Sequence, residues 1–175
     1  MMVGEGNISY KDTEAVDGSA QPVDRVARAR ELFLKGYNCS QSVFCAFADM
    51  YGISDEMALK VSASFGGGIG RMRGTCGTVC GMAMLAGMEK GQTLPDDRWQ
   101  KQENYKLVQE LAGKFKEMNG SIICSELLGL RKDAKIVSMP DERTAEYYKT
   151  RPCLRMVESA ASIWQDYLNT LGRKF

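Results

Sequence analysis

Cysteine is the residue type in this 175-residue chain best suited to redox or metal chemistry. The sequence contains six of them: Cys39, Cys45, Cys76, Cys80, Cys124 and Cys153. The chain has no histidine, which excludes imidazole ligands and catalysis by a Ser-His or Cys-His pair. No two cysteines are separated by only two residues, so zinc-finger and ferredoxin spacings are absent. A metal site would therefore have to assemble from cysteines that lie far apart in the sequence.

Four of the cysteines lie at predicted helix N-termini, where the helix dipole and the free N–H groups favour a thiolate. Four helix starts that converge at one end of a bundle would form a four-thiolate metal site from Cys39, Cys76, Cys124 and Cys153. The alternative is that these cysteines are small core residues. We expect that role for Cys45, which lies in the middle of a helix, and for Cys80, although Cys80 is close enough to Cys76 to reach a shared site.

Cys76 is the expected nucleophile. It opens a helix, Gly74 and Gly77 beside it supply N–H donors, and Arg71 and Arg73 supply positive charge. All of these features lower the pKa of a thiol from its usual value near 8.5.

A glycine-rich segment, SFGGGIGRMRGTCG, leads into Cys76. It does not fit the dinucleotide pattern G-x-G-x-x-G, and it lacks the Lys-Ser/Thr of a P-loop, so nucleotide binding is disfavoured. Two interpretations remain: a tight turn that needs positive φ angles, or a loop whose N–H groups approach an anionic sulfur site. On the second interpretation the candidate cofactor-binding residues are Gly67, Gly68, Gly74 and Gly77.

The hydrophobic periodicity predicts an all-α bundle of five to seven helices. We expect helices at about 24–35, 38–52, 54–64, 76–90 and 95–118 and from Pro152 onward, with 131–151 as an irregular surface segment. The helix at 76–90 has no charged residue before Glu89 and should be the central, buried one. Gly77 and Gly81 lie on one of its faces, which indicates close approach of another backbone or of a bound group.

Composition places the chain among soluble globular proteins of one domain, residues 23–175, with a flexible tail at 1–22. The net charge of +1 argues against nucleic acid as a partner, and no stretch is apolar enough for a membrane span. The polar N-terminus lacks the layout of a signal peptide. We therefore expect a cytoplasmic protein with reduced cysteines. A homodimer is left open, and the sequence does not identify a redox partner.

Four short motifs resemble the C_GCAxxG_C_C family of redox-active proteins: NCSQSV at 38–43, GGGIGRMRGTCGTVCG at 66–81, CSELLG at 124–129 and RPC at 151–153. The family's recurring cysteines match Cys39, Cys76, Cys124 and Cys153. Its CGAxxG motif corresponds to residues 76–81, with Thr78 in place of alanine. A similar domain is part of split-Soret cytochromes, which hold an iron–sulfur centre, so the resemblance implies redox chemistry.

Three functions remain open from the sequence. The first is a four-cysteine site that ligates an iron–sulfur cluster or another metal for electron transfer or redox sensing. The second is a metal-free thiol–disulfide protein in which Cys76 attacks and another cysteine resolves. The third is a non-catalytic helical adaptor with structural cysteines. The sequence does not decide between an oxidoreductase and an electron carrier.

Overall fold

The computed structural model describes residues 23–173, so the tail expected at 1–22 lies outside the described residues. The described residues form eight α-helices and two short 3₁₀ helices: α1 (Arg25–Leu34), α2 (Cys39–Cys45), η1 (Ala48–Tyr51), α3 (Asp55–Ser62), η2 (Ala63–Phe65), α4 (Gly77–Lys90), α5 (Arg98–Asn119), α6 (Cys124–Leu127), α7 (Ala145–Thr150) and α8 (Cys153–Thr170). Between residues 23 and 173 there is no strand beyond one isolated residue pair. The prediction of an all-α domain is confirmed.

The helix boundaries differ from the prediction at two places. The helix expected at 38–52 ends at Cys45, because Phe47 leaves the helical region with a φ of −127° and the chain continues as η1. The segment 131–151, expected to be irregular, contains α7. Together with the four-residue α6, this raises the number of α-helices in the described chain above the expected five to seven.

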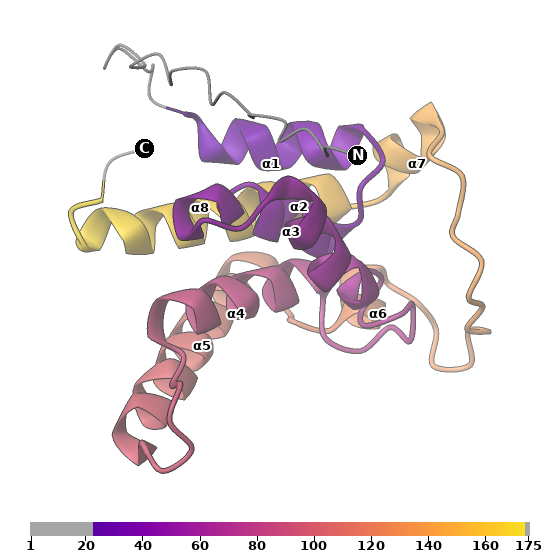
Figure 1. Cartoon of the computed structure of the whole chain (residues 1–175). Coiled ribbons are helices and arrows are strands. Elements are labelled where there is room, and N and C mark those ends of the chain that lie inside the picture. The colour runs from indigo at the N-terminus through magenta and orange to yellow at the C-terminus, as the bar shows by residue number, and fades with distance from the viewer. Residues whose placement is uncertain (1–22, 174–175) are drawn as a thin grey trace, which may run out of the picture.

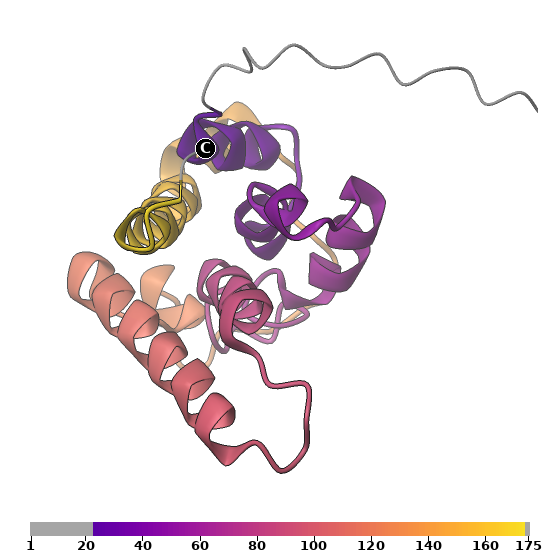
Figure 2. The same cartoon turned by 60° about the vertical axis from the view of Figure 1, so that its left-hand side comes forward.

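The helices pack around one core. Figure 1 shows α1, α8 and α2 above α4 and α5, and Figure 2 shows the same groups from a second side. Helix α4 packs on α2, α5 and α8, and α1 packs on α2 and α8. The largest fully buried side chains are Trp164, Phe33, Phe44, Phe47 and Phe115. No described helix has the length and apolar composition of a transmembrane span.

Helix α4 is central and buried, as predicted. Leu85 has no exposed surface, and the run without charge is explained by the neighbours that surround the helix. Gly77 and Gly81 face α2. A Cβ atom at Gly81 would lie 2.9 Å from the Cβ of Val43 and 3.1 Å from the carbonyl oxygen of Ser40. These glycines therefore allow close approach of another backbone, which is one of the two reasons expected from the sequence.

Replacing Gly81 by alanine should destabilise the protein, because the added methyl group has no room between α4 and α2. We expect a loss of about 1–3 kcal/mol in the free energy of unfolding. Gly87 lies in the same helix and is the matched control, since nothing lies within 4 Å of a Cβ atom built there. Gly87→Ala should raise stability by about 0.5–1 kcal/mol. Urea unfolding of both variants tests this, and a Gly81→Ala protein as stable as the unmodified chain would contradict the packing argument.

Candidate functional site

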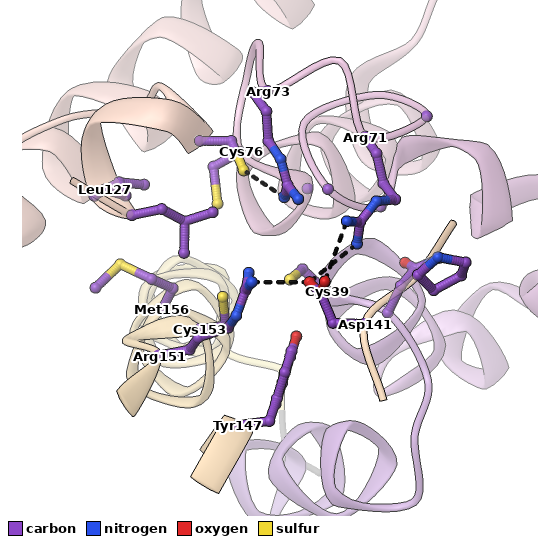
Figure 3. A pocket seen from close by; sticks show the side chains of 18 of the residues that line it. Cys39, Arg71, Arg73, Cys76, Leu127, Asp141, Tyr147, Arg151, Cys153 and Met156 are labelled. Atoms are coloured by element: carbon purple, nitrogen blue, oxygen red, sulfur yellow. Dashed lines mark hydrogen bonds and ion pairs between the residues drawn. The ribbon is translucent and has the colours of Figure 1, made fainter. Parts of the chain in front are cut away.

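Four cysteines from four separate helices line one cavity of about 290 Å³: Cys39, Cys76, Cys124 and Cys153. Figure 3 shows Cys39, Cys76 and Cys153 around this hollow, together with Arg71, Arg73 and Arg151. Cys45 and Cys80 do not line it. The structure therefore brings together the four cysteines that the sequence selected. Their roles as metal ligands or nucleophile stay predictions.

Each of these cysteines lies at a helix N-terminus, as expected. Cys39, Cys124 and Cys153 are the first residues of α2, α6 and α8. Cys76 is the residue that precedes α4. The starts of four helices thus contribute one cysteine each to the same cavity.

Asn38 fixes the start of α2 relative to the glycine-rich loop. Its side-chain oxygen accepts hydrogen bonds from the N–H groups of Ser40 (3.1 Å) and Gln41 (3.0 Å), and the Gln41 side chain accepts from the Asn38 N–H (3.0 Å). This is the predicted capping box. The Asn38 side chain also donates to the carbonyl of Ala63 at 2.8 Å. A Cβ atom at Gly66 would lie 2.5 Å from that side chain, so only glycine fits beneath it.

A short antiparallel pairing joins the chain before α4 to the chain before α6. Thr75 pairs with Ile123. On either side, the Cys76 N–H donates to the carbonyl of Ile122, and the Cys124 N–H donates to the carbonyl of the residue before Thr75, both at 2.7 Å. Two cysteines that are 48 positions apart in the sequence are therefore held by the same pair of hydrogen bonds.

The glycine-rich loop is a left-handed turn. Five successive residues have positive φ angles: Gly67, Gly68, Ile69, Gly70 and Arg71. Arg73 adopts the same conformation, with a φ of 64°. For a β-branched residue such as Ile69 this conformation is a genuine outlier, and strained residues of this kind cost about 1–3 kcal/mol. The interpretation of the loop as a tight turn needing positive φ is confirmed.

The N–H groups of this loop are largely used within the loop itself. The Gly74 N–H, expected to be free for an anionic ligand, donates instead to the carbonyl of Gly68 at 3.1 Å, so that expectation is wrong. Gly68 does not line the cavity. A Cβ atom there would lie 2.7 Å from the Cβ of Cys124, so its role is close packing. Gly67 and Gly77 do line the cavity.

The comparison with protein families matches residues 37–167 to the family described as "Putative redox-active protein (C_GCAxxG_C_C)". The chain belongs to this family. The match spans all four cysteines of the cavity, and it confirms the resemblance found in the sequence. No curated protein and no solved structure gives a significant match.

Arginine side chains make the cavity of this C_GCAxxG_C_C protein strongly basic. Its lining contains four of them and one carboxylate: Arg71, Arg73, Arg143, Arg151 and Asp141. Asp141 pairs with Arg71 at 3.3 Å and with Arg151 at 2.8 Å. The hydrogen bond from Arg71, with the nearby charge of Arg151, lowers the pKa of Asp141. The single carboxylate is thus shared by two of the four arginines.

The other two arginines have no carboxylate partner within the described residues. Arg73 donates to the sulfur of Cys124 at 3.9 Å, a weak contact. The Arg143 guanidinium lies 4.5 Å from the ring centre of Phe33 and 4.6 Å from that of Tyr147. One of its nitrogens is buried without a hydrogen-bond partner. An orphaned donor and surplus positive charge indicate that the cavity suits an anionic group.

Cys153 carries the most acidic thiol in the cavity. A hydrogen bond from Cys39, with the charges of Arg151 and Arg143, lowers the pKa of Cys153 to about 7 against the opposing effect of burial. The same interaction, together with burial, raises the pKa of Cys39 well above its usual value. Cys39 and Cys153 therefore behave as a thiol donating to a thiolate.

Cys76 does not have the lowered pKa that its position predicts. Burial raises the pKa of the Cys76 thiol, and a hydrogen bond with Thr78 at 3.1 Å offsets this only in part. Burial also raises the pKa of Cys124 despite Arg73 beside it, and that of Cys80 to about 11. The expectation of a lowered pKa for Cys76 is therefore wrong, whereas its role as nucleophile stays a prediction. Burial raises the pKa of Cys45, as expected of an inert thiol.

Metal ligation by the four cysteines stays a prediction. Within residues 23–173, no three cysteine, aspartate or glutamate side chains are close enough to hold one ion. All four cysteines line the same cavity.

The contribution of the segment 131–151 to the cavity was not predicted from the sequence. It supplies Ser138, Pro140, Asp141, Arg143, Tyr147 and Arg151 to the cavity lining. Its charge and lack of periodicity predict a surface excursion instead. The one signal in the sequence is the position of Arg151 directly before the Pro-Cys pair.

Alkylation of the reduced, metal-free protein should modify Cys153 first. A thiol with a pKa of about 7 is mostly protonated at pH 6 and mostly ionised at pH 8, so the rate should rise through that interval. Arg151→Gln should move the rise to higher pH. Residue-resolved mass spectrometry between pH 5 and 9 measures both effects, with buried Cys45 as the unreactive control. Faster modification of Cys76 than of Cys153 would contradict this order of thiol acidity.

Proposed function

We propose that the four cysteines of the cavity act together as one redox centre by ligating an iron–sulfur cluster with two or more irons. The protein would then transfer or sense electrons. The observation that carries the proposal is that four cysteines from four separate helices line one cavity of about 290 Å³. We also propose a cytoplasmic location, because six free cysteines suit a reducing compartment.

The donor set fits a cluster better than a single ion. A lone tetrahedral ion with bonds of about 2.3 Å needs sulfurs within about 4 Å of one another. A cluster spreads its ligands, and four cysteines are its usual protein ligands. Such a cluster would accept and donate single electrons, with a potential set by nearby charge, hydrogen bonds and solvent exposure.

The residues of the cavity have three tasks in this proposal. The helix starts and the pairing at Thr75 and Ile123 hold the thiols in place. The arginines offset the negative charge of four thiolates, which matters because three of the four thiols have raised pKa values and must lose protons on binding. Burial of Cys76 and Cys124 limits the access of water.

A specific observation favours a second candidate, a metal-free dithiol centre. The Cys39 thiol donates to Cys153, whose pKa is about 7. In this reaction the Cys153 thiolate attacks a substrate disulfide and releases one thiol. Cys39 then loses its proton and attacks the mixed disulfide, which releases the second thiol and leaves a Cys39–Cys153 disulfide. The two cysteines are oxidised and the substrate is reduced. This mechanism leaves Cys76 and Cys124 without a role, so we rank it second.

Serine substitution at each of the four cavity cysteines should abolish or strongly reduce bound iron and acid-labile sulfide after anaerobic reconstitution, together with visible absorption. Cys45→Ala is the matched control, because Cys45 is buried away from the cavity. It should retain the full iron content and cost about 1 kcal/mol or less in stability.

Two results would favour the dithiol centre over the cluster. One is a colourless protein that takes up no iron under anaerobic conditions. The other is a Cys39–Cys153 disulfide that forms on oxidation and is unaffected by Cys76→Ser. Equal iron content in the four serine variants and in Cys45→Ala would contradict a shared four-cysteine centre.

A further inference from the structure

We propose that the outer rim of the cavity is a docking surface for an acidic electron-transfer protein. The rim comprises residues 69–73 of the glycine-rich loop and residues 130–143 between α6 and α7. The proposal rests on the proposed redox function, and it adds a partner and the surface that recognises it.

The two parts of the rim are joined to each other above the cavity. The Arg71 side chain donates to the carbonyl of Val137 at 3.0 Å and pairs with Asp141. Ser138, Pro140 and Asp141 also line the cavity. Figure 1 shows the segment between α6 and α7 running along the outer edge of the molecule. A protein that binds there would therefore lie next to the cysteines, as electron transfer requires.

The rim exposes more apolar surface than a solvated loop needs. Three of its side chains are more than half exposed: Met72 at 62%, Ile136 at 57% and Met139 at 75%. The rim also contains exposed Ile69, Leu130 and Val137. Exposed apolar groups that are gathered at one site and interspersed with charge mark interaction surfaces, and methionine and arginine are enriched there.

The charge of the rim selects the kind of partner. It carries six basic side chains against three acidic ones: Arg71, Arg73, Arg131, Lys132, Lys135 and Arg143 against Asp133, Asp141 and Glu142. Arg131, Lys132 and Lys135 are exposed, whereas the other three basic side chains are half-buried and line the cavity. The resulting surplus of three positive charges exceeds the net charge of +1 of the whole chain. Asp141 and Asp133 are already paired with arginines, which leaves Lys132 and Lys135 free of ion pairs within the described residues. A partner with an acidic surface would be attracted to this rim, and a second copy of the same rim would be repelled.

Binding of a strongly acidic plant-type ferredoxin, used as the probe, tests the proposal. We compare a rim variant, Arg131→Glu/Lys132→Glu/Lys135→Glu, with a control variant on α5, Arg98→Glu/Lys106→Glu/Lys114→Glu. All six side chains are exposed, and both variants change the net charge equally. At low salt, isothermal titration should show at least tenfold weaker binding for the rim variant and less than a twofold change for the control. The difference should shrink as added salt screens the charges.

Titration measures binding with or without a functioning redox centre, so it separates the two proposals. Selective weakening by the rim variant supports the docking surface even in iron-free protein. If the protein holds a cluster, the rate at which reduced ferredoxin reduces it should fall in the same rim variant, whereas the rate with a neutral photoreductant should not. Equal weakening by both variants would overturn the proposal, as would absence of ferredoxin binding at low salt. Rim-dependent binding to anionic phospholipid vesicles without ferredoxin binding would also overturn it.

Discussion

The approach of α4 to α2 across Gly77 and Gly81 is the contact on which the position of the cavity depends. A Cβ atom at Gly77 would lie 3.2 Å from the Cβ of Cys39, so the missing side chain is what brings the starts of the two helices together. Cys76, directly before Gly77, then lines the same cavity as Cys39. The pairing that ties Cys76 to Cys124 adds a third element. Helix α8, packed on α2 and α4, adds Cys153.

Two opposing effects set the pKa values of the thiols in the cavity: burial raises them, and the positive charge of the arginines lowers them. Burial raises the pKa of Cys76 and Cys124, and only at Cys153 do a neighbouring thiol and the arginines outweigh it. The left-handed loop places two further arginines of the cavity lining, Arg71 and Arg73, which both adopt strained backbone angles. Strain that persists next to a cluster of ionisable groups is typical of functional sites. Arg71 and Arg73 line the cavity and also belong to the rim outside it.

Most structural features that depend on residues close together in the sequence were predicted correctly. Helix starts follow from capping residues such as Asn38, and the buried helix follows from its lack of charge, so the four cysteines at helix starts could be selected from the sequence. The order of thiol acidity could not be predicted from the sequence. It depends on which side chains from 131–151 reach the cavity, and on how deeply Cys76 is buried. Both result from tertiary packing, because that segment has no periodicity and its ion pairs join residues as far apart as Arg71 and Asp141.

Native mass spectrometry of the anaerobically purified protein tests the shared four-cysteine centre most directly. The added mass counts irons and sulfides, and the number of missing protons counts the cysteines that have become ligands. We expect one cluster per chain with at least two irons, inorganic sulfide and four cysteine protons lost. A chain of unmodified mass after anaerobic reconstitution, a chain two protons lighter because of a disulfide, or a chain holding one ion would contradict the cluster.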